Sequence, residues 1–358
     1  MINYVELVIA LCIAILGTFL LTYPVKWFAI KIDAVDRPNQ RKIHKKVMPR
    51  LGGLAIFLGA FLGVLYLRPE HDYLPEIWIG AIVILITGAI DDKYTISPVV
   101  KLTGQFVATS FLVSSGLFID RITLPFFGVV ELGLLSVIVT VVWVIGITNA
   151  INLIDGLDGL ASGVTTIALI SIFIMSIIDM QWIVTVLCIA MIGANIGFLF
   201  HNFHPAKIYM GDSGSNFLGF MIAVISMLGL FKNLTFFSFI VPIIVLAVPI
   251  FDTLFAIYRR AINNESIMQA DNKHVHYQLL KAGFSHRKTV LIIYMFSALF
   301  GMLAILFSNA SMSTLLIVFG FVILLLHLFA EVSGTVGSGR KPMISTLDKI
   351  FRGKRRTQ

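Results

Sequence analysis

The sequence predicts an all-α, polytopic integral membrane protein with about eleven transmembrane helices. Hydrophobic residues make up 58% of its 358 residues and charged residues only 13%, which is too little charge to cover a soluble protein of this length. Long windows hold no Asp, Glu, Lys or Arg, and each reaches the roughly 20 apolar residues that a helix needs to cross a bilayer. The clearest windows are 132–154, 180–200, 234–251 and 289–330.

The apolar segments and their polar boundaries define the organisation of the chain. We expect residues 1–332 to form one transmembrane domain and residues 333–358, which are rich in Gly, Lys and Arg, to form a flexible basic tail. Between the fourth and fifth helices, residues 119–133 alternate in polarity and predict a small hairpin. The expected helices span 5–23, 51–67, 77–91, 99–118, 133–151, 159–178, 183–200, 213–230, 236–257, 290–307 and 312–331.

Basic residues are distributed unevenly between the two sides of this arrangement. With the N-terminus outside, only Arg68, Arg121 and Lys232 of the 27 Lys and Arg residues fall on the outer side. Because basic loops remain cytoplasmic, we expect the N-terminus outside and the C-terminus in the cytoplasm of a multi-pass protein of the cell membrane. This topology, together with contact to anionic lipid of the bilayer, explains the net charge of +8, so no nucleic-acid partner is implied.

Two adjacent carboxylates, Asp91 and Asp92, end one apolar run on the expected cytoplasmic side. Neighbouring carboxylates repel each other and resist ionisation when they are desolvated. The alternative is a solvated helix end, which one Asp beside Lys93 would satisfy. We favour a functional doublet that is held by cations.

Four amide or carboxyl side chains recur at intervals of three in TNAINLIDGLDGLA. They are Asn149, Asn152, Asp155 and Asp158. On an unbroken helix the first and last would face opposite ways, because each step of three residues drifts by about −60°. Gly156 and Gly159 are expected to end the helix, so the oxygens can converge on one loop. Helix capping by Asp158 is the alternative, although it would use only one of the four.

The stretch from Tyr209 to Ser215, YMGDSGS, opens the eighth expected helix. Its small residues allow backbone amides to approach an anion, and a helix N-terminus attracts phosphate. Asp212 could chelate a hard cation that bridges this phosphate. A simple Asp or Ser cap explains the same residues equally well.

Three further features lie on the expected cytoplasmic side. His274 and His276 belong to a basic loop. Residues two apart do not share a helical face, so paired zinc ligation is disfavoured. Phosphate binding and a solvated basic loop explain these histidines equally well. Lys46 lies in a basic stretch that positive-inside anchoring mostly explains. For Asp252, seven residues before Arg259, we expect an ion pair or helix contact.

Together, these motifs bring oxygen ligands close to Lys, Arg and His at one water–lipid boundary. Such oxygen ligands suit Mg²⁺, or Mn²⁺ in its place, rather than zinc. The combination is typical of phosphoryl transfer on a diphosphate, in which catalysis is mostly positioning and charge stabilisation. We therefore expect one water-soluble substrate and one lipid substrate.

In order along the chain, Asp91-Asp92, TNAINLIDGLDG, YMGDSGS and DNKHVH resemble the motifs of the polyprenyl-phosphate N-acetylhexosamine-1-phosphate transferases, most closely the bacterial TagO/WecA branch. The resemblance runs from Lys46 to about Leu280 and implies that residues 1–332 form a transmembrane glycosyl-1-phosphate transferase domain. It implies that UDP-N-acetylglucosamine (UDP-GlcNAc) and undecaprenyl phosphate give undecaprenyl-diphosphate-GlcNAc and UMP, with Mg²⁺, at the cytoplasmic face. The expected downstream polymer is wall teichoic acid.

The resemblance also implies roles for individual residues. Asp91 matches the usual candidate base, Asp158 and Tyr209 match positions that bind uracil, and Lys101 matches a lysine that faces the phosphates. The full expected set is Asp212 and Asn152 for the metal, Asp91, Asp92 and Asp155 for catalysis, and Lys46, Lys101, Asn149, Asp158, Tyr209, His274 and His276 for substrate binding. A single in-line displacement is expected, while a two-step route through an Asp nucleophile is left open, as is a homodimer.

One position departs from the family pattern, and three alternative functions remain to be weighed. Tyr277 stands where the branch commonly has a second consecutive His, which weakens a specific role for the His motif.

The absence of a triple-His run disfavours the related enzyme that acts on UDP-MurNAc-pentapeptide. An ion-coupled transporter predicts acids near the bilayer midplane rather than at one boundary, and a membrane scaffold gives no reason for four oxygen-rich motifs on one side.

Overall fold

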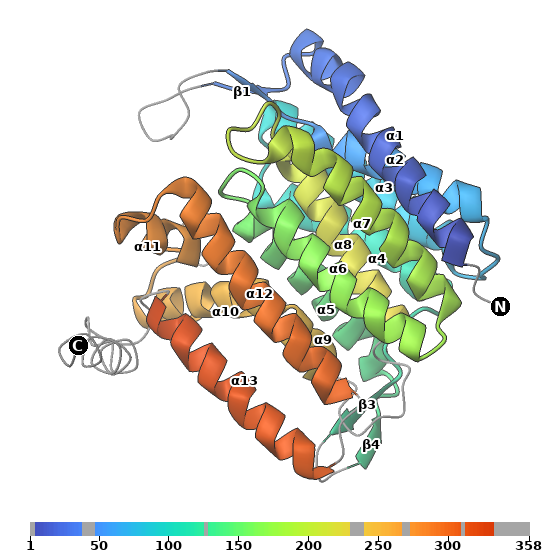
Figure 1. Cartoon of the computed structure of the whole chain (residues 1–358), viewed down its shortest axis with the longest axis vertical. Coiled ribbons are helices and arrows are strands. Elements are labelled where there is room, and N and C mark those ends of the chain that lie inside the picture. The colour runs from blue at the N-terminus through green and yellow to red at the C-terminus, as the bar shows by residue number, and fades with distance from the viewer. Residues whose placement is uncertain are drawn as a thin grey trace, which may run out of the picture.

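The computed structural model describes residues 4–37, 47–124, 128–229, 240–266, 273–308 and 312–332. These residues form α-helices and two antiparallel two-stranded hairpins, which lie at opposite ends of the helices (Figure 1). The helices are α1 (Tyr4–Lys31), α2 (Gly52–Leu67), α3 (Leu74–Tyr94), α4 (Pro98–Ser114), α5 (Leu135–Ile154), α6 (Leu160–Ile178), α7 (Trp182–Asn202), α8 (Gly211–Gly229), α9 (Ile240–Val245), α10 (Ala247–Ile262), α11 (Val275–Lys281), α12 (His286–Ser308) and α13 (Met312–Val332).

Each expected transmembrane segment contains a helix. The ninth is divided at Leu246 into α9 and α10, and the short α11 was not predicted, because seven residues give too little periodicity to read. The expected hairpin is present as β3 (Arg121–Leu124) paired with β4 (Gly128–Glu131). A second hairpin, β1 (Val35–Asp36) with β2 (Met48–Pro49), was also missed, since two-residue strands carry no pattern. The expected tail, 333–358, lies outside the described residues.

The outer helices expose apolar side chains that water would not tolerate over so large an area. Leu20 is 61% exposed on α1, Val142 66% on α5 and Met302 59% on α12. Within the described residues, six helices are long and apolar enough to cross a membrane, namely α1, α3, α5, α6, α7 and α12. The protein is therefore a multi-pass membrane protein, while the number of crossings and their orientation remain predictions.

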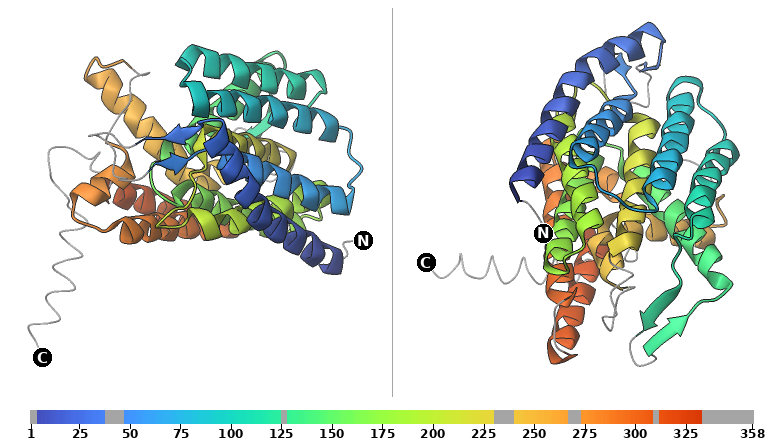
Figure 2. Two further views of the ribbon diagram at one scale, coloured as in Figure 1. Left: turned by 90° about the horizontal axis from the view of Figure 1, so that it is seen from above. Right: turned by 90° about the vertical axis from the view of Figure 1, so that its right-hand side faces the viewer.

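Helix α8 is the core of the molecule. Every residue from Ser213 to Gly229 is buried, so this helix has no lipid-facing side. Helices α3 and α5 pack along it, and α2 and α7 also contact it. Figure 2 shows α8 surrounded by the other helices when the molecule is seen from two further directions. Because α8 begins with Gly211 and Asp212, the central position of the helix places its polar N-terminus among the ends of its neighbours.

Glycines allow the backbones of α2 and α8 to approach closely. A Cβ added at Gly53 would overlap the backbone of Ser213 and Gly214, and one at Gly214 would meet the backbone of Gly53. Gly88 of α3 makes a similar approach to Ser213. These contacts leave no room for side chains, so they set the distance between the N-terminus of α8 and the adjoining parts of α2 and α3.

We expect Gly53→Ala to destabilise the protein, because the added methyl group meets backbone rather than a flexible side chain. Overpacking of this kind costs about 1–3 kcal/mol. Gly146→Ala in α5 is the matched control, since a Cβ there meets nothing within 4 Å and Ala is the better helix former. Thermal melting of the purified protein in detergent should show a lower midpoint for Gly53→Ala alone. Equal midpoints in the two variants would contradict the close α2–α8 contact.

Candidate active site

The polar residues expected from separate motifs lie together at the ends of four helices. Asn152, at the end of α5, donates from Nδ2 to Oδ1 of Asp212 (2.5 Å) and to Oγ of Ser215 (2.8 Å) in the first turns of α8. Lys101 of α4 donates from Nζ to Oδ2 of Asp212 (3.1 Å) and forms an ion pair with Asp91 of α3. The structure thus joins Asp91 to Asp212 through Lys101 and Asn152 to Asp212 directly, although Asp91 and Asp212 are 121 positions apart in the chain.

Asp91 is held from both sides. Its Oδ1 accepts a hydrogen bond from the backbone N of Ile96 (2.7 Å) in the turn between α3 and α4, and its Oδ2 pairs with Lys101. The side chain of Asp91 is only 4% exposed, whereas that of Lys101 is 25% exposed. The carboxylate is therefore fixed, and the lysine is the member of the pair that a substrate can reach more easily.

Asp92 binds the N-terminus of α8. Its Oδ1 accepts from the backbone N of Asp212 (2.8 Å), and its Oδ2 accepts from the backbone N (3.1 Å) and Oγ (2.7 Å) of Ser213. The carboxylate is fully buried at 0% exposure. Both oxygens of Asp92 therefore hold the N-terminus of α8, and the expectation that Asp92 acts in catalysis alongside Asp91 stays a prediction.

A cavity of about 380 Å³ opens beside these contacts. Both expected metal ligands, Asn152 and Asp212, line it, as do Asp155, Asp158 and Tyr209. The other lining residues are Asp36, Arg50, Gly156, Leu157, Asn202, His204, Met210, Gly211, Tyr277 and His286.

The cavity carries an excess of negative charge. Burial, together with the neighbouring carboxylates of Asp212 and Asp92, raises the pKa of Asp155 to about 7. This donor set, in which carboxylate and amide oxygens face a shared cavity, fits a hard divalent cation such as Mg²⁺ better than zinc. Asn152 uses its Nδ2 to orient Asp212, which leaves its amide oxygen as a further ligand.

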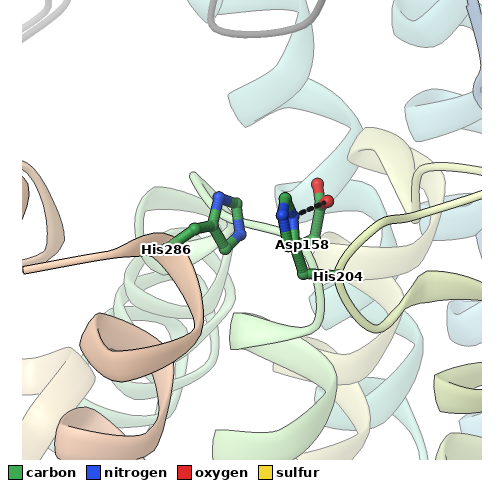
Figure 3. A group of neighbouring side chains, drawn as sticks. All are labelled: Asp158, His204 and His286. Atoms are coloured by element: carbon green, nitrogen blue, oxygen red, sulfur yellow. Dashed lines mark hydrogen bonds and ion pairs between the residues drawn. The ribbon is translucent and has the colours of Figure 1, made fainter.

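Asp158 lies at the other side of the cavity and is held by the α7–α8 connection (Figure 3). Its Oδ2 accepts from Nδ1 of His204 (2.8 Å) and from the backbone N of Ala206 (3.1 Å). Within the described residues, both contacts fall on Oδ2, so Oδ1 can accept a hydrogen bond from a ligand.

His286, from the first turn of α12, completes this group. Its ring stacks on that of His204, with centroids 4.1 Å apart, and one donor atom from each of Asp158, His204 and His286 lies within 4.8 Å of the others. Arg287 donates to the carbonyl oxygen of His204 (3.1 Å). Helix α12 therefore supports the segment that orients Asp158.

The two histidines of the expected His motif are buried and do not line the cavity in the described structure. His274 Nδ1 contacts Oδ2 of Asp252 (2.8 Å), and the backbone N of Val275 donates to Oδ1 of Asp252 (2.9 Å). The ion pair or helix contact expected for Asp252 is thus present, with His274 as the partner, and it docks α11 on α10. His276 is 1% exposed and packs against Gly156, which places it behind the Asp155–Asp158 loop.

Two other expected binding residues have different outcomes. Asn149 exchanges hydrogen bonds with Gln105 (2.7 Å from Nδ2 to Oε1), and Gln105 also donates to Asn216. Asn149 therefore belongs to a buried amide network between α4, α5 and α8, and not to the residues that line the cavity. Lys46 lies outside the described residues.

Sequence reasoning missed five residues that line the cavity, namely Asp36, Arg50, Asn202, His204 and His286. Arg50 was visible in the basic stretch but was attributed to membrane anchoring. Asn202 accepts from the backbone N of Gly159 (3.0 Å) and donates to the carbonyl oxygen of Ile208 (3.0 Å), so it fixes two loops at once. His204 and His286 carry no motif spacing, because they are 82 positions apart and meet only in the fold.

Known proteins resemble this chain over nearly its whole length. The profile of glycosyl transferase family 4 matches residues 74–230, which contain Asp91, Asn152 and Asp212. The chain is 44% identical over 350 residues to a Bacillus subtilis protein named "probable undecaprenyl-phosphate N-acetylglucosaminyl 1-phosphate transferase", covering 97% of this chain and 98% of that protein.

More distant relatives extend the comparison. A decaprenyl-phosphate N-acetylglucosaminephosphotransferase of Mycobacterium tuberculosis is 33% identical over 85% of this chain and 83% of its own length. An undecaprenyl-phosphate α-N-acetylglucosaminyl 1-phosphate transferase of Pasteurella multocida is 34% identical over 89% of this chain and 91% of its own length. The chain belongs to the polyprenyl-phosphate N-acetylhexosamine-1-phosphate transferases, a family of membrane enzymes.

We expect His276 to make the stability of the protein depend on pH. Burial lowers its pKa to about 4, whereas an exposed histidine titrates near 6.5. Between these values the unfolded chain binds a proton that the folded chain excludes, so stability falls as the pH drops below about 6.5, by about 2 kcal/mol at pH 5.

Thermal melting of the wild type and of His276→Gln from pH 7 to pH 5 tests this expectation. The midpoint of the wild type should fall more steeply than that of the variant, since the difference between the two curves isolates this one side chain. Parallel curves would show that His276 titrates normally in the folded protein.

Proposed function

We propose that this protein transfers N-acetylglucosamine-1-phosphate from UDP-GlcNAc to undecaprenyl phosphate, forming undecaprenyl-diphosphate-GlcNAc and UMP at the cytoplasmic face of the cell membrane. One observation carries the proposal. Asp91 and Asp212, from α3 and α8, share the ammonium group of Lys101, and Asp212 also lines a cavity large enough for part of a nucleotide. The names of the relatives support the same reaction.

The proposed reaction is a single in-line displacement. An oxygen of the lipid phosphate forms a bond to the β-phosphorus of UDP-GlcNAc, and the bond from that phosphorus to the oxygen bridging the α-phosphate breaks. UMP leaves with the electron pair of that bond. Because the second pKa of a phosphate monoester is about 6, the nucleophile is already largely anionic at neutral pH. Asp91 therefore orients Lys101 toward the phosphates rather than removing an essential proton.

The nucleotide binds at the Asp158 side of the cavity in this proposal. Asp158 presents Oδ1 to the N–H of uracil, since its Oδ2 is held by His204 and Ala206. Tyr209 lines the same cavity and offers its ring to the base. Burial raises the pKa of Tyr209 to about 12, so its hydroxyl remains protonated at all physiological pH values.

Asp212 and Asn152 would hold the divalent cation. Bound there, Mg²⁺ supplies a positive charge that offsets charge on the diphosphate, and Mn²⁺ is expected to substitute for it. Lys101 adds a fixed positive charge on the side of Asp91. Asp92 keeps Asp212 in place through the backbone of α8, which explains why two adjacent carboxylates are needed although only Asp91 faces Lys101.

Radiolabelled UDP-GlcNAc mixed with the purified protein, undecaprenyl phosphate and Mg²⁺ tests the reaction directly. Label should pass into a lipid-extractable product as UMP appears in equal amount. Absence of this product under conditions in which the protein is folded would overturn the proposal.

Asp212→Ala should reduce turnover by at least about a hundredfold, the scale seen when one electrostatic catalytic group is removed. Glu131→Ala is the matched control, because this carboxylate lies on the exposed hairpin at the far end of α5 and should leave turnover unchanged. Initial rates of UMP release compare the two variants. Full activity of Asp212→Ala would exclude it as a metal ligand.

Removal of divalent cations should abolish turnover reversibly. Treatment with EDTA is expected to stop UMP release, and Mg²⁺ or Mn²⁺ should restore it, since the cavity offers oxygen ligands. Zn²⁺ should restore little activity. Activity that persists in excess EDTA would contradict the assignment of Asp212 and Asn152 to a cation.

The product would be the first lipid-linked intermediate of a cell-envelope glycopolymer. Wall teichoic acid remains our prediction for this polymer. Depletion of the protein in its host, followed by chemical analysis of the envelope, would show which polymer is lost.

A further inference from the structure

Arg50 lines the cavity with a well-fixed backbone and with a side chain that makes no hydrogen bond within the described residues. Its backbone N donates to the carbonyl oxygen of Ala34 (3.0 Å) at the base of the β1–β2 hairpin. On either side of Arg50, Tyr209 N donates to the carbonyl oxygen of Pro49 (2.8 Å) and Gly52 N donates to the carbonyl oxygen of Tyr209 (3.1 Å). The backbone of Arg50 is therefore tied to the segment that leads into α8.

The guanidinium group forms long ion pairs with two carboxylates but no hydrogen bond to either. Nη1 is 3.9 Å from Oδ1 of Asp92, and Nη2 is 3.8 Å from Oδ2 of Asp36. Both separations exceed hydrogen-bonding distance. In the described parts of the chain no acceptor bonds to this side chain, and its Nε is buried without a partner. A buried donor without an acceptor is costly, and because the five donors of a guanidinium lie in one plane, a single ligand in the cavity can meet several of them.

The charge around the cavity points to an anionic ligand for Arg50. Among the described residues that line the cavity, Arg50 is the only lysine or arginine, whereas Asp36, Asp155, Asp158 and Asp212 contribute carboxylates. Lys101 lies beside the cavity and makes close contacts to Asp91 and Asp212, whereas the ion pairs of Arg50 are longer than hydrogen bonds. A nucleoside diphosphate sugar must bring its phosphates into this carboxylate-lined cavity. The side chain of Arg50 is 30% exposed, so it is a cation that can bind one of the phosphate groups.

We propose that Arg50 binds the α-phosphate of the nucleotide substrate and holds the UMP product. This inference rests on the proposed function and adds a phosphate-binding residue to it. Arg50 lies between the segment of Tyr209, where the base is proposed to bind, and Asp92. Asp92 in turn accepts a hydrogen bond from the backbone of Asp212, the proposed metal ligand. The planar guanidinium matches two phosphate oxygens at once. When the bond to the β-phosphorus breaks, the negative charge that develops on the α-phosphate meets donors already in place.

The test compares the binding of uridine and UMP to the purified full-length protein by isothermal titration calorimetry in the presence of Mg²⁺. The wild type should bind UMP more tightly than uridine, because only UMP carries the phosphate. Arg50→Gln should lose at least tenfold in affinity for UMP while its affinity for uridine stays within twofold. Arg121→Gln, on the hairpin at the opposite end, is the matched control and should behave as the wild type.

Steady-state kinetics give a second readout. The KM for UDP-GlcNAc should rise in Arg50→Gln, whereas the KM for undecaprenyl phosphate should stay within twofold, because Arg50 contacts only the nucleotide. Arg50→Lys keeps the charge but lacks the planar fork, so its UMP affinity should fall between those of the wild type and Arg50→Gln. If Arg50→Gln does not fold, the lysine variant decides alone.

Two results would overturn the inference, and they are distinguishable. If the wild type prefers UMP to uridine and Arg50→Gln keeps the same preference, the phosphate is bound elsewhere and only the assignment of Arg50 fails. If the wild type itself binds neither UMP nor uridine, the proposed function fails as well.

Discussion

The geometry of this protein depends on the hydrogen bonds from the first residues of α8 to the carboxylate of Asp92. The N-terminus of a helix presents unpaired amides and a partial positive charge, and a buried carboxylate is well placed to satisfy both. Here the carboxylate comes from α3, so one interaction joins the end of a peripheral helix to the start of the central one. It places Asp91 and Asp212 on either side of Lys101. Together with the ammonium group of Lys101, it holds the carboxylates of the site close to one another despite their mutual repulsion.

Close backbone contacts make this arrangement possible. Gly53 and Gly88 allow α2 and α3 to touch the first turn of α8 directly, and a side chain at either position would push α8 away from Asp92. In a membrane, where lipid tails compete equally with apolar side chains, small residues at helix contacts are a main source of packing energy. The same glycines therefore serve stability and the alignment of the polar helix ends.

The site combines two supports of different origin. Asp91, Asp92 and Asp212 are fixed by helix ends, whereas Asp158 is fixed by the α7–α8 connection and by α12. His276 packs behind the loop that carries Asp155 and Asp158, which gives the His motif a supporting position under the cavity rather than a place in its wall. The cavity lies between these two supports, so a nucleotide bound there would span from the loop side to the charged helix ends.

The sequence by itself determined the membrane class, the position of nearly every helix and the identity of most acids and amides at the site, because hydropathy and local motifs are properties of neighbouring residues. Only the tertiary structure decided how those groups divide their work. Asp91 and Asp92 are indistinguishable in sequence, yet one faces Lys101 and the other caps α8. Arg50, His204 and His286 join the cavity from segments without any shared spacing. Such roles depend on which distant groups lie within hydrogen-bonding distance, and packing around a fully buried α8 sets those distances.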